Sequence, residues 1–107
     1  MTAMDAHELD RERRRLVRDL PSLHEVLRAS LFERSRRCGK ANCHCSEAGD
    51  PGHRVVCVSL SGPQGKPSQV SVPQRLVPVA EAWIENSRRW LEAIERISAI
   101  NHELLRM

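Results

Sequence analysis

The sequence predicts a mostly helical α+β protein, and three observations carry that prediction. The four cysteines of the chain all lie between residues 38 and 57. Two short segments that follow the first three cysteines are rich in β-branched or alternating residues, as in strands. From Val79 to about Arg106 the chain has apolar residues at three- and four-residue steps, without Pro or Gly. We therefore expect two N-terminal helices, a metal-stabilised loop with a short β-hairpin, and a long C-terminal helix.

The N-terminal third carries two helix-start signals. Residues 5–8 have the pattern of a capping box, which predicts a helix from about Asp5 to Asp19, ended by Pro21. Residues 22–25 repeat the pattern. Apolar residues then recur at helical spacing, which predicts a second helix as far as about Arg36.

The middle of the chain is expected to combine a loop with a hairpin. Residues 38–53 contain the glycines that tight turns require, and they oppose any regular element. Residues 54–61 and 69–72 read as strands, with residues 62–65 as the turn between them. A two-stranded hairpin is marginal in water, so the cysteine loop is its expected support.

The C-terminal helix is expected from Val79 to about Arg106, with Pro78 suited to its first turn. A heptad seam runs along it, and its stripe is too broad for a two-stranded contact. The helix should pack on the N-terminal helices, on a second copy of the chain, or on both. The predicted oligomer interface consists of Trp83, Trp90, Ile94, Ile97, Asn101 and Leu104.

Length and composition predict one compact domain. Its 107 residues divide into a helical pair (1–37), a cysteine-rich loop with the hairpin (38–73) and the long helix (74–107). One Phe, two Trp and no Tyr leave few aromatic anchors, so a metal or a partner chain is the usual support at this size. No apolar run approaches the length of a membrane span and the N-terminus has no apolar signal core, which predicts a cytoplasmic protein.

The cysteines predict a structural zinc site. Thiolates are the soft ligands that Zn²⁺ prefers, and clustered cytoplasmic cysteines are more often metal ligands than disulfides. Cys38, Cys43 and Cys45 are the expected ligands, with Cys57 or His53 as the fourth. An iron–sulfur cluster and a redox thiol switch are the alternatives.

Basic residues lead into the cysteine loop, where only Glu33 offsets four positive charges. The arginines of the N-terminal segment are interleaved with acids and read as a solvated helix face. The second group predicts contact with nucleic acid phosphates. With so few aromatic side chains for stacking, duplex or structured nucleic acid is the expected partner. The predicted contact residues are Arg34, Arg36, Arg37, Lys40 and His44.

The motif in residues 37–45, Arg-Cys-Gly-Lys-x-x-Cys-x-Cys, is followed by a Gly/Pro loop, a strand pair and a Trp-containing helix. In this the chain resembles, over residues 36–106, a small prokaryotic domain family of unknown function that is often encoded near mobile elements. The first thirty-five residues lie outside the resemblance. That family usually has His-Gly-Pro and then aromatic strand residues where this chain has Gly52-His53-Arg54 and then valines and Cys57. The resemblance implies a metal-stabilised module and no known catalytic activity.

An enzyme is not expected. The sequence has no phosphate-binding Gly loop, no nucleophile elbow and no pair of carboxylates near the cysteines apart from turn residues Glu47 and Asp50. The first functional hypothesis is a small zinc-binding nucleic-acid-binding or regulatory module. The alternative is a metal-stabilised interaction or accessory subunit of a larger assembly, docked through the C-terminal helix.

Overall fold

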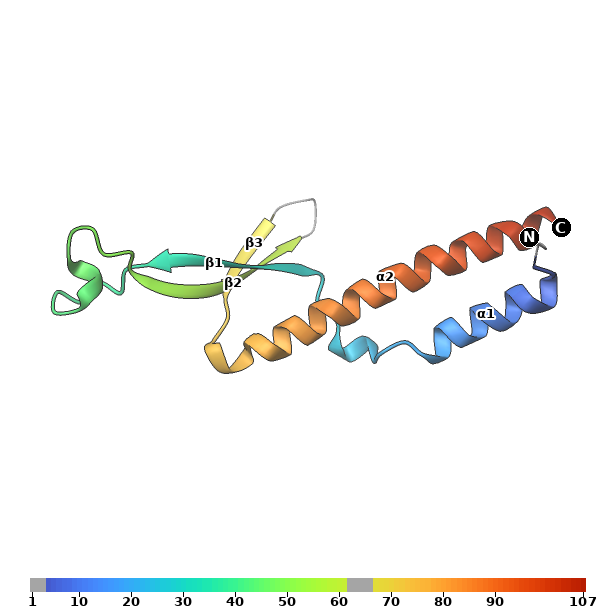
Figure 1. Ribbon diagram of the computed structural model, residues 1–107, viewed down its shortest axis with the longest axis horizontal. Helices are drawn as coiled ribbons and strands as arrows, with labels where there is room; N and C mark the ends of the chain where they lie inside the picture. The colour runs from blue at the N-terminus through green and yellow to red at the C-terminus, as the bar shows by residue number, and fades with distance from the viewer. Residues whose placement is uncertain (1–3, 62–66) are drawn as a thin grey trace. The chain divides into compact units, whose positions relative to one another are not determined.

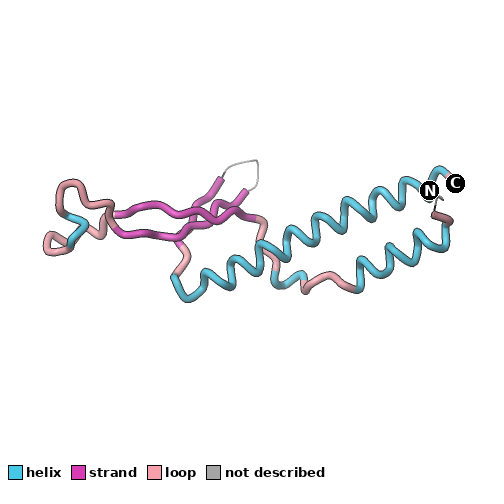
Figure 2. The backbone as a smooth tube through the Cα atoms, viewed as in Figure 1, coloured by secondary structure: helices cyan, strands magenta, loops and turns pink. Residues whose placement is uncertain are grey.

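The structure is a computed structural model that describes residues 4–61 and 67–107. Its helices and strands, in chain order, are α1 (Ala6–Arg18), β1 (Ala29–Arg36), β2 (His53–Ser61), β3 (Pro67–Ser71) and α2 (Val77–Arg106) (Figure 1). Single turns of 3₁₀ helix lie at Leu23–Glu25, His44–Ser46 and Gln74–Leu76 (Figure 2). The predicted α+β class is confirmed.

The described residues form two units. One unit combines the residues up to Leu27 with those from Glu85 onward, and the other comprises Arg28–Ile84. The first is helical and contains α1 with most of α2. The second contains the sheet, the cysteine loop and the start of α2.

In the helical unit, α1 begins as predicted. The Asp5 carboxylate accepts a hydrogen bond from the Glu8 backbone N–H at 2.8 Å, which satisfies one of the free donors of the first turn. The helix runs antiparallel to the C-terminal part of α2 (Figure 1). Leu9, Ala93 and Ile100 are buried, and Ile100 is only 1% exposed.

Polar contacts fix the alignment of α1 and the segment after it on α2. The Arg96 guanidinium donates to both carboxylate oxygens of Glu12, each at 2.7 Å. Asn101 accepts from Arg13 at 2.8 Å, and the Trp90 indole donates to the Pro21 carbonyl at 2.9 Å. Two residues of the predicted oligomer seam, Trp90 and Asn101, thus contact the chain's own N-terminal segment.

The ion pair of Glu12 and Arg96 gives the helical unit a pH dependence. The hydrogen bond from Arg96 lowers the pKa of Glu12 below its ordinary value. A carboxyl group whose pKa is lower in the folded state stabilises the protein at pH values above its unfolded-state pKa. This stabilisation is lost as the pH falls through the folded-state pKa. We therefore expect Glu12→Gln to reduce the loss of stability between neutral pH and pH about 3. Urea unfolding midpoints at both pH values measure this loss of stability, with Glu81→Gln as the control. A loss in Glu12→Gln as large as in the native protein would contradict the prediction.

The other residues of the predicted seam are divided by exposure. Ile97 and Leu104 are partly buried, whereas Trp83 and Ile94 are exposed. Ile94, at 53% exposure, belongs to an apolar stripe on α2 that also includes Leu91 and Leu105.

The described residues contain no helix of the length and apolarity that a bilayer requires. Self-association through α2 stays a prediction.

The second unit is built on a three-stranded antiparallel sheet in the order β1-β2-β3. Cys57 of β2 pairs with Phe32 on one side and Ser71 on the other. The predicted hairpin of β2 and β3 is confirmed, and its expected turn at 62–65 lies outside the described residues. The predicted long helix is also confirmed, with Pro78 in the first turn of α2.

The predicted second N-terminal helix is wrong. The start signal at Ser22 does act as a cap, because its hydroxyl accepts from the His24 N–H at 3.3 Å. It is followed by only one 3₁₀ turn, and the chain then enters β1. The physical reason is the edge of β2, which offers a full ladder to residues 29–36. A third strand also gives the sheet the support that an isolated hairpin lacks.

The ladder of β1 and β2 extends beyond β3. Strand β3 pairs only with Cys57–Ser61, whereas β1 pairs with β2 along its whole length. Val72 adds one further bond, to the Val56 carbonyl at 2.8 Å, so residues 34–36 and 53–55 form the two-stranded segment, here termed the distal ribbon. The cysteine loop joins its two strands at one end (Figure 2).

Candidate metal centre

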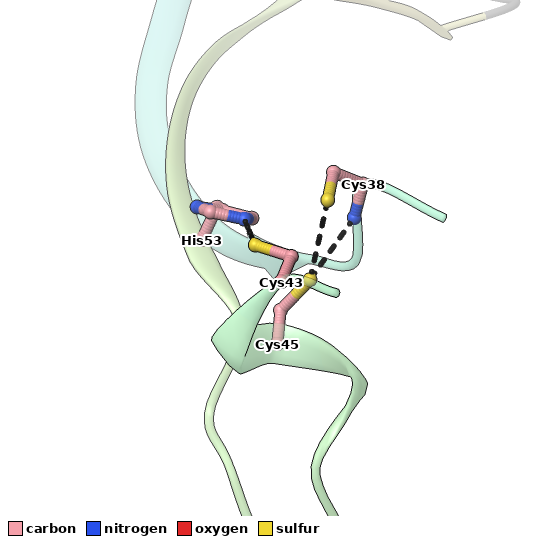
Figure 3. Close-up of side chains that lie close together, drawn as sticks. All are labelled: Cys38, Cys43, Cys45 and His53. Carbon is pink, nitrogen blue, oxygen red and sulfur yellow. Dashed lines mark hydrogen bonds between the residues drawn. The ribbon is translucent and has the colours of Figure 1, made fainter. Parts of the chain in front are cut away.

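Three cysteines and one histidine converge where the distal ribbon ends. The ligand atoms of Cys38, Cys43, Cys45 and His53 all lie within 4.8 Å of one another (Figure 3). Cys38 follows β1, Cys43 and Cys45 lie at the 3₁₀ turn of the loop, and His53 is the first residue of β2. The register that places Arg36 opposite His53 brings the two ends of the loop together.

The distances suit a single four-coordinate ion. The Sγ atoms of Cys38 and Cys45 are 3.4 Å apart, and Sγ of Cys43 lies 3.2 Å from Nε2 of His53. A tetrahedron with zinc–sulfur bonds of about 2.3 Å has edges of about 3.8 Å. The Cys38 backbone N–H also donates to Sγ of Cys45 at 3.4 Å. Sulfur and imidazole nitrogen are the donor set that zinc prefers.

Of the two candidates for the fourth ligand, the structure brings His53 into the cluster and leaves Cys57 out. Cys57 lies four residues further along β2, which is about 13 Å at the rise of a strand. Its side chain is 1% exposed and belongs to the core of the sheet. A small apolar side chain explains a buried cysteine at this position.

Local backbone features shape the loop. Gly39 has φ +84°, which lets the chain turn directly after Cys38, as expected. The Ser46 hydroxyl donates to the carbonyls of Ala41 and Cys43, at 2.9 and 2.7 Å. Gly52 has φ +86°, and a Cβ there would lie 3.0 Å from the Arg36 carbonyl oxygen. Only glycine therefore allows the approach that sets His53 opposite Arg36.

Arg37 braces the loop. Its guanidinium donates to the Asp50 carbonyl at 3.2 Å and reaches the Glu47 carbonyl at 3.5 Å. These bonds hold the far side of the loop against the end of β1. Arg37 was predicted to contact nucleic acid, and the sequence gives no signal for its bonds to two distant carbonyls.

Asp50 ties down the return of the loop to β2. Its carboxylate accepts from the Gly52 N–H at 2.7 Å and contacts Nδ1 of His44 at 3.1 Å. The hydrogen bond from the Gly52 N–H is the main cause that lowers the pKa of Asp50, and the contact with His44 is the second. The Asp-Pro-Gly sequence at 50–52 is a turn signal, but it does not predict the pairing with His44.

His44, a predicted contact residue, is exposed and is not a member of the cluster. Its ring meets the His53 ring edge to face, with centroids 4.6 Å apart. The His44 imidazole thus lies between the His53 ring of the candidate site and the Asp50 carboxylate. It helps to orient His53.

The remaining predicted contact residues lie beside the cluster. Arg34 and Arg36 alternate along β1 and so share one face of the distal ribbon, and both are exposed, as is Lys40 in the loop. Among the described residues none of the three makes an ion pair. Glu33 projects from the opposite face, where it lies 3.4 Å from Arg54.

This arrangement defines a small α+β protein with a Cys₃His candidate metal site at the end of a β-ribbon. Residues 6–82 match the model of a family described as a domain of unknown function, DUF6788. The match covers most of the sequence, so the chain belongs to that family. It begins earlier and ends earlier than the expected resemblance at 36–106, and it includes α1. Comparisons with curated proteins and with solved structures found no match.

Proposed function

We propose that this protein is a non-enzymatic nucleic-acid-binding module built around a structural zinc ion. The ion is held by Cys38, Cys43, Cys45 and His53, and it joins the loop to the distal ribbon. A loop rich in turns and poor in apolar residues gains little from burial, so metal binding supplies its folding free energy.

The donor set supports a structural and not a catalytic ion. Catalytic zinc sites commonly have three protein ligands and an open position for water or substrate, whereas four protein ligands close the coordination sphere. Of the two acids in the loop, Asp50 is engaged by Gly52 and His44. Asp50 is therefore not free to act as a general base.

One observation carries the nucleic-acid proposal. Arg34, Arg36 and Lys40 are exposed around the end of the distal ribbon, and they have no acidic partner among the described residues. A rigid cluster of unpaired positive charges is the electrostatic footprint of phosphate binding. The metal loop holds this cluster at a fixed place.

The direct test measures binding of a fluorescent random-sequence DNA duplex pool across a range of salt concentrations. We expect affinity to fall as salt rises, with a slope of log affinity that decreases by about 0.9 for each phosphate contact removed. Arg34→Ala/Arg36→Ala/Lys40→Ala should weaken binding to the whole pool. Zinc content should stay unchanged, because none of the three is a ligand.

A matched control removes the same charge elsewhere. Arg11, Arg28 and Arg75 are exposed and make no ion pair within the described part of the chain. The Arg11→Ala/Arg28→Ala/Arg75→Ala variant should bind almost as tightly as the native protein. Equal weakening by both triple variants would show that net charge, and not this cluster, drives binding.

A second candidate is an interaction or accessory subunit. The observation that favours it is the exposed stripe of Leu91, Ile94 and Leu105 on α2. An apolar stripe at helical spacing suits a groove or another helix. The absence of salt-dependent binding to any duplex would make this the better proposal.

A further inference from the structure

We infer that the distal ribbon binds in the major groove of duplex DNA, with the face that carries Arg34 and Arg36 turned toward the base edges. Lys40 then contacts the phosphates at the groove edge. This inference rests on the proposed function and adds the kind of nucleic acid, the groove and the reading residues.

The width of the ribbon fits the groove. Two antiparallel strands lie about 4.8 Å apart, and the major groove of B-DNA, about 12 Å wide, admits a two-stranded ribbon. Strand β3 pairs from Cys57 onward, and Val72 still donates to the Val56 carbonyl at 2.8 Å, so only residues 53–55 of β2 have β1 as their single neighbour. Arg34 and Arg36 therefore lie on the part of the sheet that is narrow enough to enter the major groove.

The spacing of the two arginines fits the repeat of the duplex. Arg34 and Arg36 are two positions apart on one strand, so their side chains leave the same face about 6.7 Å apart. Two base-pair steps cover about 6.8 Å of the DNA axis. The guanidinium group can donate two hydrogen bonds to guanine O6 and N7, which is the commonest specific contact in this groove.

The two faces of the distal ribbon differ in charge. On the reading face, Arg34 lies opposite Val55 and Arg36 opposite His53. Val55 lines a depression beside them, together with Arg36, Cys38 and His53, and it offers apolar contact of the kind a thymine methyl accepts. On the other face, Glu33 neutralises Arg54. Charge complementarity thus favours one face only.

The same features disfavour RNA and single strands. The major groove of A-form RNA is too narrow and deep for side chains to read. Single strands are bound mainly by aromatic stacking, and the distal ribbon has no Phe, Trp or Tyr. Duplex DNA is the partner that this surface fits.

The test compares three probes at one salt concentration, each as a pool of short random-sequence duplexes. They are unmodified DNA, DNA in which every cytosine carries a glucosylated hydroxymethyl group, and RNA. The sugar fills the major groove without changing the backbone charge. We expect the glucosylated DNA and the RNA to bind at least about tenfold more weakly than unmodified DNA, the loss of one good base contact. A minor-groove ligand should not compete.

Variants on the two faces provide matched controls. After selection from the pool, Arg34→Ala and Arg36→Ala should each lose about tenfold of the discrimination between preferred and random sequences. Lys40→Ala should weaken binding to all sequences alike and reduce the salt slope by about 0.9. The opposite-face variant Glu33→Gln/Arg54→Gln, which keeps the net charge, should bind as the native protein does.

The outcomes separate the two proposals. Salt-dependent binding that is equal for unmodified and glucosylated DNA overturns the groove inference and leaves the nucleic-acid proposal standing. Binding to RNA that is as tight as, or tighter than, binding to unmodified DNA also overturns the groove inference and leaves the nucleic-acid proposal standing. A larger loss of DNA affinity in Glu33→Gln/Arg54→Gln than in the arginine variants would show that the opposite face binds DNA, and it would overturn the groove inference. No salt-dependent binding to any probe overturns the proposed function itself.

Discussion

Cys43→Ser is expected to lose the bound zinc and to lower the free energy of unfolding by several kcal/mol. The reason is that metal binding at such a site is largely folding free energy, so a missing ligand removes the support of the whole loop. The effect should extend to the distal ribbon, because Cys38 and His53 stand at the ends of its two strands. Elemental analysis of anaerobically purified protein should find about one zinc per native chain, and denaturant unfolding measures the stability.

The fourth ligand is tested in the same way. His53→Ala should lose zinc as Cys43→Ser does, whereas Cys57→Ala should keep full zinc content because that side chain lies in the core of the sheet. Zinc loss in Cys57→Ala with retention in His53→Ala would contradict the ligand set. Native protein without metal, or Cys43→Ser with an unchanged melting temperature, would favour a redox role for the thiols.

Ile100→Ala is expected to have the second largest effect, about 2 to 5 kcal/mol on unfolding of the helical unit. Ile100 is 1% exposed, and removal of three methyl or methylene groups leaves a cavity that the helices fill only in part. Urea unfolding followed by helical circular dichroism measures the loss.

Ile94→Ala is the matched control, since the same residue type lies on the same helix at 53% exposure. It should change the unfolding free energy by less than about 0.5 kcal/mol. If Ile94→Ala proved as costly as Ile100→Ala, the exposed stripe would be buried in solution by a partner or a second copy. That result would strengthen the interaction-subunit proposal.

Local signals in the sequence were enough for several elements. The capping pattern at Asp5 predicted the start of α1 because a cap depends only on residues within one turn. The periodicity of α2 and the β-branched run of β2 are equally local. The cysteine spacing predicted the cluster of Cys38, Cys43 and Cys45 because ligands on one short loop can meet without any distant contact.

The sequence did not predict the features that depend on strand pairing. Residues 29–36 have a spacing that also suits a helix, and only the long-range ladder with β2 makes them a strand. The loop role of Arg37 depends on carbonyls ten and thirteen residues away, whose approach no local pattern encodes.

The sequence by itself determined that a cysteine cluster lies between a capped helix and a long amphipathic helix, because those features rest on short-range chemistry. Only the tertiary structure decided between His53 and Cys57. Both lie on β2, and the pairing of His53 with Arg36 places the histidine, not the cysteine, at the end of the ribbon where the loop closes. Cys57 lies about 13 Å further along the strand, so the register brings His53 and not Cys57 to the candidate site.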